Sequence, residues 1–389
     1  ELHKEYRRQR QMCIRDSLST VIVDAEQLGW GCSSRNGGQV SGEVKPSYKE
    51  LARLHGPAQA YAIIAEARSA LQWVGDFINE EGIDCDYRHC GRFHAAHSAQ
   101  QYATQKQEFK SQVKGLERDG HLVDETQIRN EVDSPFYHGG LVINQHASLD
   151  PARYHQALYE RTLASGCHVV DNCRVENIVR NADGFNLVTA KGQIRAGKVV
   201  VATSGYTGSA TPWHQRRIIP IGSYMLATEM LDPDLARSLI PNDRVVSDTR
   251  KLVVYYRLSP DGRRILFGAR VSYKETDPIS SAGPLRLEML RIFPQLADAK
   301  ITHSWMGFVG YTFDKLPHLG EDNGLFYAMG YCGSGICLSS YFGHRLGQQA
   351  LGIPDAKIPM NGLRFETVSY THLRAHETDS YLVCRLLLE

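Results

Sequence analysis

The chain has 389 residues, of which 42% are hydrophobic and 22% charged, and its 44 lysines and arginines almost balance 43 aspartates and glutamates. This composition excludes a disordered or fibrous protein, and the length favours two domains, each with its own core. The absence of a basic excess, of an apolar stretch long enough for a membrane span and of a secretory signal predicts a cytoplasmic protein without a nucleic-acid partner.

The two ends differ in composition from the rest of the chain. Residues 1–17 are crowded with arginine and glutamine and lack periodicity, and residues 368–389 follow a proline-containing stretch. The strings MCIRDS and SYTHLRAHET resemble translated adapter sequence. We therefore expect both ends to be artefactual tails and leave them out of the fold. The alternative is a genuine basic arm and a genuine amphipathic tail.

A short apolar strand is predicted over residues 20–23, and it leads into Asp24. An acid at the end of the second strand of a Rossmann βαβ unit accepts hydrogen bonds from the ribose of a bound dinucleotide. Residues 29–39, GWGCSSRNGGQ, then combine four glycines with short polar side chains. Such a segment exposes backbone N–H groups, its serines can cap a helix or donate to a phosphate, and Arg35 adds further donors. A plain surface turn is the alternative.

The middle of the chain alternates between helix and strand signals. Asp150 followed by proline predicts a helix that ends at Ser165 and Gly166. A strand at 167–170 and a β-meander follow, because short β-branched runs are separated by turn residues. A buried strand over residues 198–205 ends in small residues that let a ligand approach, although a core strand followed by a turn gives the same pattern.

Residues 212–300 carry aromatic and β-branched runs, including residues 251–257 and 265–270, that predict antiparallel strands. We expect these strands to form a sheet over a ligand cavity. Tyr255, Tyr256 and Arg270 are candidates for lining that cavity. No role is assigned to them, because aromatic residues in strands usually belong to the core.

A glycine-rich turn over residues 330–336 follows a predicted strand at 324–329 and begins a helix. Apolar residues recur in that helix at near-helical spacing, at Leu338, Tyr341, Phe342 and Leu346. The N-terminus of the helix has free N–H groups and a positive dipole end. It is therefore suited to stabilise an electron-rich ligand beyond the turn.

Together these motifs resemble the D-amino-acid-oxidase-like (DAO) family of FAD-dependent oxidoreductases over about residues 20–352. The resemblance rests on GWGCSSRNGGQ, on VVVATSG and on the order W-x-G, T-x-D-x-x-P-x-x-G and G-x-x-G-x-G, and it is closest to the γ-glutamylputrescine oxidase branch. It implies FAD as the cofactor. The candidate cofactor-binding residues are Asp24, Ser33, Ser34, Arg35, Asn36, Gly37, Gly38, Gln39, Val175, Thr203, Ser204, Gly205, Gly333, Ser334, Gly335 and Ile336.

The resemblance also implies the fold class, a mixed α/β (α+β) chain in which a Rossmann-like FAD-binding domain is interleaved with a β-rich substrate domain. We expect residues 18–85, 145–215 and 305–367 in the FAD-binding domain. Residues 86–144 and 216–304 are expected in the substrate domain.

Two features depart from the family pattern. Ser334 stands where many members carry a histidine, so the chain lacks the imidazole that those members have there. The G-x-G-x-x-G fingerprint that belongs ahead of Asp24 is absent, because the first glycine in the chain is Gly29. We therefore expect a fragment truncated at its N-terminus that binds FAD poorly, is weakly soluble and carries little yellow colour.

The resemblance implies oxidation of the C–N bond of an amine or amino acid, with γ-glutamylputrescine-like compounds among the candidates, to an imine and then an aldehyde or keto acid. Oxygen is the expected acceptor and hydrogen peroxide the product. The alternatives are a flavin dehydrogenase that uses a quinone or a carrier protein, and a non-catalytic fragment unable to hold FAD. We name no catalytic residue, since the flavin supplies the chemistry. Nine scattered cysteines predict reduced structural thiols and no metal site.

Overall fold

The computed structural model describes residues 19–269 and 277–367. The two expected tails, 1–17 and 368–389, and Arg270 lie outside the described residues. Among the helices that the structure describes, none has both the length and the apolar character needed to cross a membrane.

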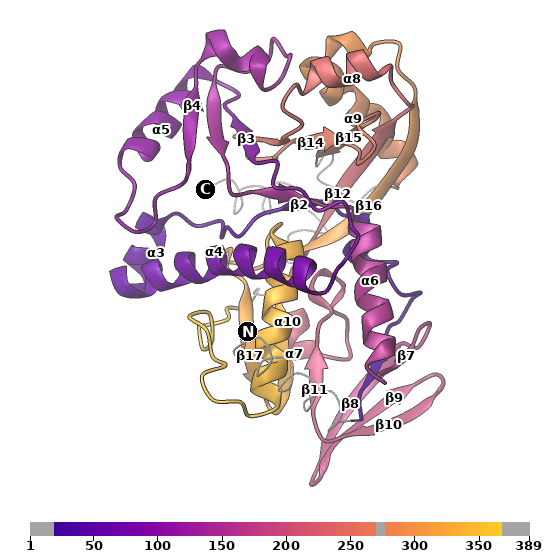
Figure 1. Cartoon of the computed structure of the whole chain (residues 1–389). Helices are drawn as coiled ribbons and strands as arrows, with labels where there is room; N and C mark the ends of the chain where they lie inside the picture. The colour runs from indigo at the N-terminus through magenta and orange to yellow at the C-terminus, as the bar shows by residue number, and fades with distance from the viewer. Residues whose placement is uncertain (1–18, 270–276, 368–389) are drawn as a thin grey trace, which may run out of the picture.

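An eight-stranded sheet fills the upper half of the molecule in Figure 1. Neighbouring strands are antiparallel except for the parallel pair β13 and β3. In spatial order the strands are β16 (Ile301–Tyr311), β12 (Ile219–Thr228), β15 (Ile265–Ala269), β14 (Tyr255–Leu258), β13 (Val245–Asp248), β3 (Arg92–Ala95), β5 (Gly140–Ile143) and β4 (Gly120–Val123). The helical elements of this half are α5 (Ala99–Lys110), η1 (Glu125–Asn130), α8 (Pro233–Leu239), α9 (Pro278–Ile292) and η3 (Pro294–Leu296).

The lower half is built from smaller sheets. Strand β1 (Val21–Val23) pairs in parallel with β7 (His168–Val170), and β11 (Val199–Val201) pairs in parallel with β18 (Leu325–Met329). The remaining strands of this half are β17 (His318–Asp322), which pairs with β18, and the meander of β8 (Val175–Asn181), β9 (Gly184–Thr189) and β10 (Gly192–Ala196). The short pair β2 (Gln39–Val40) and β6 (Ala147–Ser148) lies between the two halves, where Gln39 bonds to strands of the large sheet. The helices are α2 (Cys32–Arg35), α3 (Tyr48–His55), α4 (Pro57–Glu80), α6 (Pro151–Ala164), η2 (Ser204–Tyr206), α7 (Pro212–Gln215) and α10 (Gly335–Ala350).

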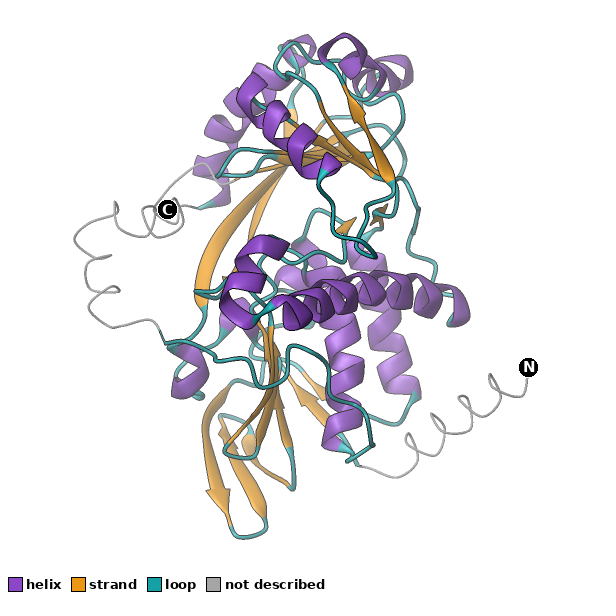
Figure 2. Cartoon of the chain, turned by 90° about the vertical axis from the view of Figure 1, so that its left-hand side faces the viewer, coloured by secondary structure: helices purple, strands orange, loops and turns teal. Residues whose placement is uncertain are grey.

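Helix α4 crosses the molecule between the large sheet and the lower strands, as both overall views show (Figures 1 and 2). It is 24 residues long and starts with a proline at its first position. Its buried residues recur every three or four positions and face α3 and α10. Because α4 shares one core with α10, it fixes the position of the turn that precedes α10.

Local signals explain several of these elements. The Asp150 carboxylate accepts hydrogen bonds from the backbone N–H groups of Ala152 and Arg153, which caps α6 as the sequence predicts. The predicted meander and the helix after the glycine-rich turn are also present. The mixed α/β class is therefore confirmed.

Two strand predictions need correction. The run 251–257 is not one strand, because β14 begins only at Tyr255. The Asp248 carboxylate accepts hydrogen bonds from the N–H groups of Arg250 and Val254, so the chain turns there before it extends. The expected antiparallel sheet also contains one parallel pair, β13 with β3.

Candidate functional site

A cavity of about 3030 Å³ joins the two halves of the molecule. Its walls include β1, β11 and the first turn of α10 at one end, and β3, β13 and β14 at the other. Single small-molecule sites occupy roughly 300–1,000 Å³, so this cavity has room for a dinucleotide and a substrate together.

The glycine-rich segment after β1 lies between the two halves. The Arg35 guanidinium lies over the Trp30 ring, 4.7 Å from its centroid, and the Arg35 carbonyl accepts a hydrogen bond from Trp305 Nε1 at 2.8 Å. Gln39 donates through Nε2 to the carbonyls of Val246 and Tyr256 at 3.1 and 3.2 Å. These contacts hold the segment against strands of the eight-stranded sheet.

The glycine-rich turn before α10 meets the chain that follows this segment. The Ser334 hydroxyl donates to the carbonyl of Glu43 at 2.7 Å. Gly333, whose φ is +98°, lies close to Lys45: a Cβ added at this glycine would be 3.8 Å from Lys45 Nζ. No side chain among the described residues caps α10, so its first N–H groups stay available to a ligand in the cavity. The two turns that the sequence singled out thus converge on one cavity.

Most candidate residues lie on the wall of this cavity. Those that line it are Asp24, Ser33, Arg35, Asn36, Gly37, Gln39, Val175, Thr203, Ser204, Gly333, Ser334, Gly335 and Ile336. Ser34, Gly38 and Gly205 do not. The Ser34 hydroxyl donates to the Gly29 carbonyl, and Gly38 and Gly205 are buried against the backbones of Leu149 and Phe308, so these three support the wall from behind.

The residues present fit FAD at both of its ends. The Asp24 carboxylate borders the cavity, and its Oδ1 accepts a hydrogen bond from the Glu26 N–H at 2.9 Å. It forms no ion pair within the part of the chain that the structure describes, so its other lone pairs can accept from a ribose. The uncapped N-terminus of α10 suits the electron-rich ring of a reduced flavin. Between these ends, Ser33 and Arg35 are among the side-chain donors that line the cavity.

A cluster of charged and imidazole side chains, here called the polar cluster, lies at the other end of the cavity. Its members are Glu43, Lys45, Arg92, His94, Arg118 and His146. Arg118 Nε lies 2.9 Å from Glu43 Oε1, and His146 Nε2 lies 3.9 Å from Glu43 Oε2. Burial alone would raise the pKa of Glu43, but Arg118, followed by His146 and Arg92, holds it well below its ordinary value. Desolvation within the cavity, followed by the charge of Arg92, lowers the pKa of Lys45, although this side chain remains exposed to solvent in the open cavity. The cluster therefore has one firmly ionised acid among several bases.

The two histidines of the cluster are neutral at neutral pH. Burial, followed by the charge of Arg92, lowers the pKa of His94 to about 4 and that of His146 to about 3. Neither ring therefore brings a positive charge to the cavity under ordinary conditions.

Acid should destabilise the fold through these histidines. Below the unfolded pKa of about 6.5, an unfolded histidine takes up a proton that the buried one refuses, so stability falls as pH falls toward the folded pKa. We expect each ring to remove about 2 kcal/mol of unfolding free energy between pH 6.5 and pH 5. Urea unfolding at pH 7 and pH 5 measures this loss, and His146→Gln should reduce it by about that amount. An equal pH response in wild type and variant would contradict the assignment.

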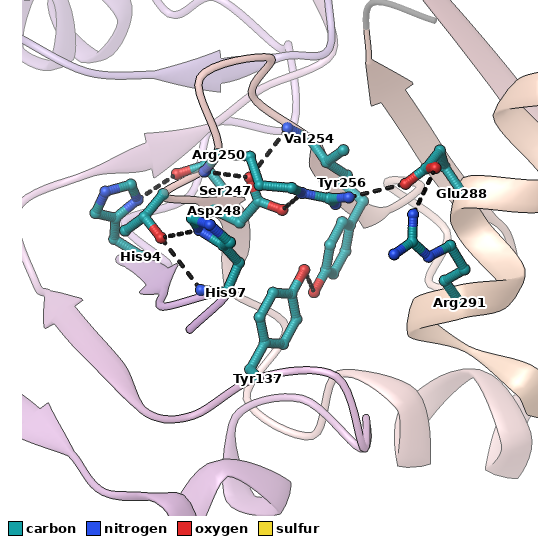
Figure 3. Close-up of polar contacts among 11 residues, drawn as sticks. His94, His97, Tyr137, Ser247, Asp248, Arg250, Val254, Tyr256, Glu288 and Arg291 are labelled. Carbon is teal, nitrogen blue, oxygen red and sulfur yellow. Dashed lines mark hydrogen bonds and ion pairs between the residues drawn. The ribbon is translucent and has the colours of Figure 1, made fainter. Parts of the chain in front are cut away.

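A second polar network holds the loop between β13 and β14 over the cavity (Figure 3). Asp248, which is 1% exposed, binds Arg250 Nε at 2.6 Å, and Arg250 Nη1 continues to Glu288 at 2.8 Å. Beside it, His94 Nδ1 lies 3.1 Å from Ser247 Oγ, and His97 Nδ1 lies 2.7 Å from Thr249 Oγ1. The network fixes the wall that residues 247–249 contribute to the cavity.

The sequence pattern does not predict the polar cluster. One signal was available, because RFHA at 92–95 alternates polar and apolar residues and so places Arg92 and His94 on one face of a strand. Glu43 and Lys45 carry no such pattern. Only the fold brings them beside β3.

Comparisons with known proteins agree on a family. The sequence matches the family described as FAD dependent oxidoreductase (DAO) over residues 11–349. It is 30% identical over 337 residues to γ-glutamylputrescine oxidoreductase of Escherichia coli strain K12, covering 86% of this chain and 78% of that protein. A probable oxidoreductase OrdL of Rhizobium meliloti is 27% identical over 368 residues, covering 91% of this chain and 84% of that protein.

A solved structure shares the fold. Glycine oxidase from Geobacillus kaustophilus superposes with a TM-score of 0.72 at 19% identity, covering 87% of this chain and 90% of that one. The family match spans both ends of the cavity, from the segment after β1 to the first turns of α10. The chain therefore belongs to the DAO family of FAD-dependent oxidoreductases.

Proposed function

We propose that this chain oxidises the C–N bond of an amine or amino acid and reduces oxygen to hydrogen peroxide. The overall reaction consumes the amine, oxygen and water, and it yields an aldehyde or keto acid, ammonia or a smaller amine, and hydrogen peroxide. We also propose that the lower half, with β16, serves as the FAD-binding domain and that the rest of the eight-stranded sheet carries the substrate.

The observation that carries the proposal is the convergence of the Arg35 segment and the Gly333 turn on one cavity that continues to β3 and β13. The names of two similar proteins, a γ-glutamylputrescine oxidoreductase and a glycine oxidase, support amine or amino-acid substrates. FAD, when bound, would supply the acceptor for a hydride from the carbon next to nitrogen.

The chain's own residues would bind and orient both partners. Asp24 would hold the ribose, and the backbone N–H groups at the start of α10 would face the ring. On the opposite wall, Tyr255 and Ser223 share a hydrogen bond at 2.7 Å, and burial raises the pKa of Tyr255. Because this tyrosine stays protonated, it acts as a hydrogen-bonding group and not as a base.

The test is to load the protein with FAD and mix it, without air, with a panel of primary amines, secondary amines and amino acids. We expect at least one compound to bleach the visible flavin absorbance and air to restore it with stoichiometric peroxide. Bleaching that only a quinone or dye reverses would assign a dehydrogenase instead of an oxidase. Full flavin occupancy without bleaching by any amine would contradict the proposed chemistry.

A further inference from the structure

The glycine-rich turn before α10 has an unfavourable backbone conformation. Gly330, Cys332 and Gly333 have φ values of +78°, +49° and +98°. Because cysteine carries a Cβ, the left-handed conformation costs about 1–2 kcal/mol at Cys332. Strain of this kind persists only where the surrounding structure imposes it. The contacts that impose it here therefore control how the first N–H groups of α10 meet the cavity.

The chain that precedes β17 supplies these contacts. Gly330 lies directly against Thr312, because an added Cβ would overlap the Thr312 methyl group. The Thr312 hydroxyl donates to the Leu316 carbonyl at 2.8 Å and lies 3.7 Å from Cys332 Sγ. The hydrogen bond from Thr312 to Leu316 closes a second turn, residues 312–316. The position of the glycine-rich turn thus depends on the shape of this second turn.

A buried pair of side chains fixes the turn at 312–316. Asp314 Oδ1 accepts from the Leu316 N–H at 3.1 Å, and His318 Nε2 lies 3.1 and 3.0 Å from the two carboxylate oxygens of Asp314. The His318 side chain is 2% exposed and that of Asp314 17%. Burial alone would raise the pKa of Asp314, but the hydrogen bonds from His318 and from the Leu316 N–H hold it below its ordinary value. The carboxylate is therefore ionised, and His318 Nε2 is the donor.

His318 also connects this pair to the strand that leads into α10. It is the first residue of β17 and lies opposite Met329, the last residue of β18, which is followed directly by Gly330. Strands β17 and β18 lie beside α10, as Figure 1 shows for β17. The His318 ring stacks on Phe365, with the ring centroids 4.1 Å apart and the planes 6° from parallel. The imidazole is therefore held by Phe365 at one face and by Asp314 at Nε2.

We propose that His318 and Asp314 are positioning residues that direct the N–H groups at the start of α10 toward the flavin ring. Neither side chain lines the cavity, so both act through the glycine-rich turn. N–H groups at a helix N-terminus stabilise negative charge, which a flavin ring gains on reduction. The pair should therefore strengthen binding of the ring and raise its reduction potential. The inference deepens the proposed function and rests on it for the identity of the ligand.

Binding of the two halves of FAD tests the proposal without turnover. Riboflavin contains the ring, and ADP-ribose contains the adenine end. In isothermal titration calorimetry, His318→Leu should weaken riboflavin binding about tenfold or more, because a hydrogen bond to a charged group is lost. ADP-ribose binding should be unchanged. His318→Gln places an amide N–H where Nε2 stands, so it should keep the riboflavin affinity within about threefold of wild type.

His214→Leu is the matched control. His214 is also a buried imidazole, and it packs against Tyr327, which stacks on Phe365. Both of its ring nitrogens are buried without a hydrogen-bond partner among the described residues. Its replacement therefore changes packing in the same aromatic group without loosening the pair at Asp314, and riboflavin binding should stay unchanged.

The reduction potential of bound FAD gives a second readout, which a purely structural role would not move. It should be lower in His318→Leu and unchanged in His318→Gln and His214→Leu. If His318→Leu does not fold, Asp314→Asn, which keeps the shape and removes the charge, should show the same selective loss of riboflavin binding.

Three binding results would overturn the inference: no riboflavin binding by the wild type, an undiminished riboflavin affinity in His318→Leu, or equal weakening of riboflavin and ADP-ribose. Bound flavin that no amine bleaches would instead refute the proposed function, and the two binding affinities would still test the positioning role.

Discussion

Gly38→Ala is expected to destabilise the protein by about 3 kcal/mol or more. The φ of Gly38 is +67°, a conformation that strains residues with a Cβ. An added Cβ would also overlap the carbonyl oxygen of Leu149 and lie 2.7 Å from Arg257 Nη2. These groups cannot yield easily, because Leu149 N–H donates to the Gly38 carbonyl and Arg257 donates to the Leu149 carbonyl. Urea unfolding followed by circular dichroism measures the loss.

Gly166→Ala is the matched control. Its φ is +80°, but no atom lies within 4 Å of an added Cβ, so only backbone strain of about 1 kcal/mol applies. If the two variants lose equal unfolding free energy, the close packing around Gly38 behind the cavity wall does not contribute to stability.

Glu43→Gln is expected to cost about 1–2 kcal/mol, more than the loss of an exposed ion pair but less than that of a fully buried one, because the Arg118 side chain is 38% exposed. Glu43 is the only carboxylate within ion-pair distance of Arg118 and His146 in the described ranges, and its side chain is 26% exposed. The substitution keeps the shape and the backbone carbonyl that accepts from Ser334. The loss of unfolding free energy in Glu43→Gln therefore measures how much the negative charge of Glu43 stabilises the surrounding cations.

A double variant sharpens this test. Adding Arg92→Gln should recover part of the loss, because it removes one of the cations that Glu43 offsets. Asp84→Asn, whose side chain is 84% exposed in its pair with Arg153, should change stability by less than about 0.5 kcal/mol. A Glu43 effect as small as that of Asp84 would contradict the account of the cluster.

The sequence predicted the elements that local chemistry determines. Asp150 followed by proline located the start of α6, and the turn residues between β8, β9 and β10 located the meander. The glycine-rich turn before α10 was predicted for the same reason, because its residues are needed for the turn itself.

The sequence did not predict what depends on distant contacts. The run of β-branched and aromatic residues at 251–257 does not form one strand, because the chain turns after Asp248. The Asp248 carboxylate stabilises this turn by accepting from the N–H groups of Arg250 and Val254, and the sequence pattern does not indicate these contacts. The polar cluster has the same origin, since Glu43 meets Arg118 across 75 positions of the chain. Local patterns carry no record of such pairs.

The most direct test of the central claim is a crystal structure of the chain grown with saturating FAD. We expect the flavin ring between residues 33–38 and the turn at 333–336, with its ribose near Asp24. FAD bound elsewhere, or a cavity without FAD at saturation, would contradict the claim that these two turns form one flavin site.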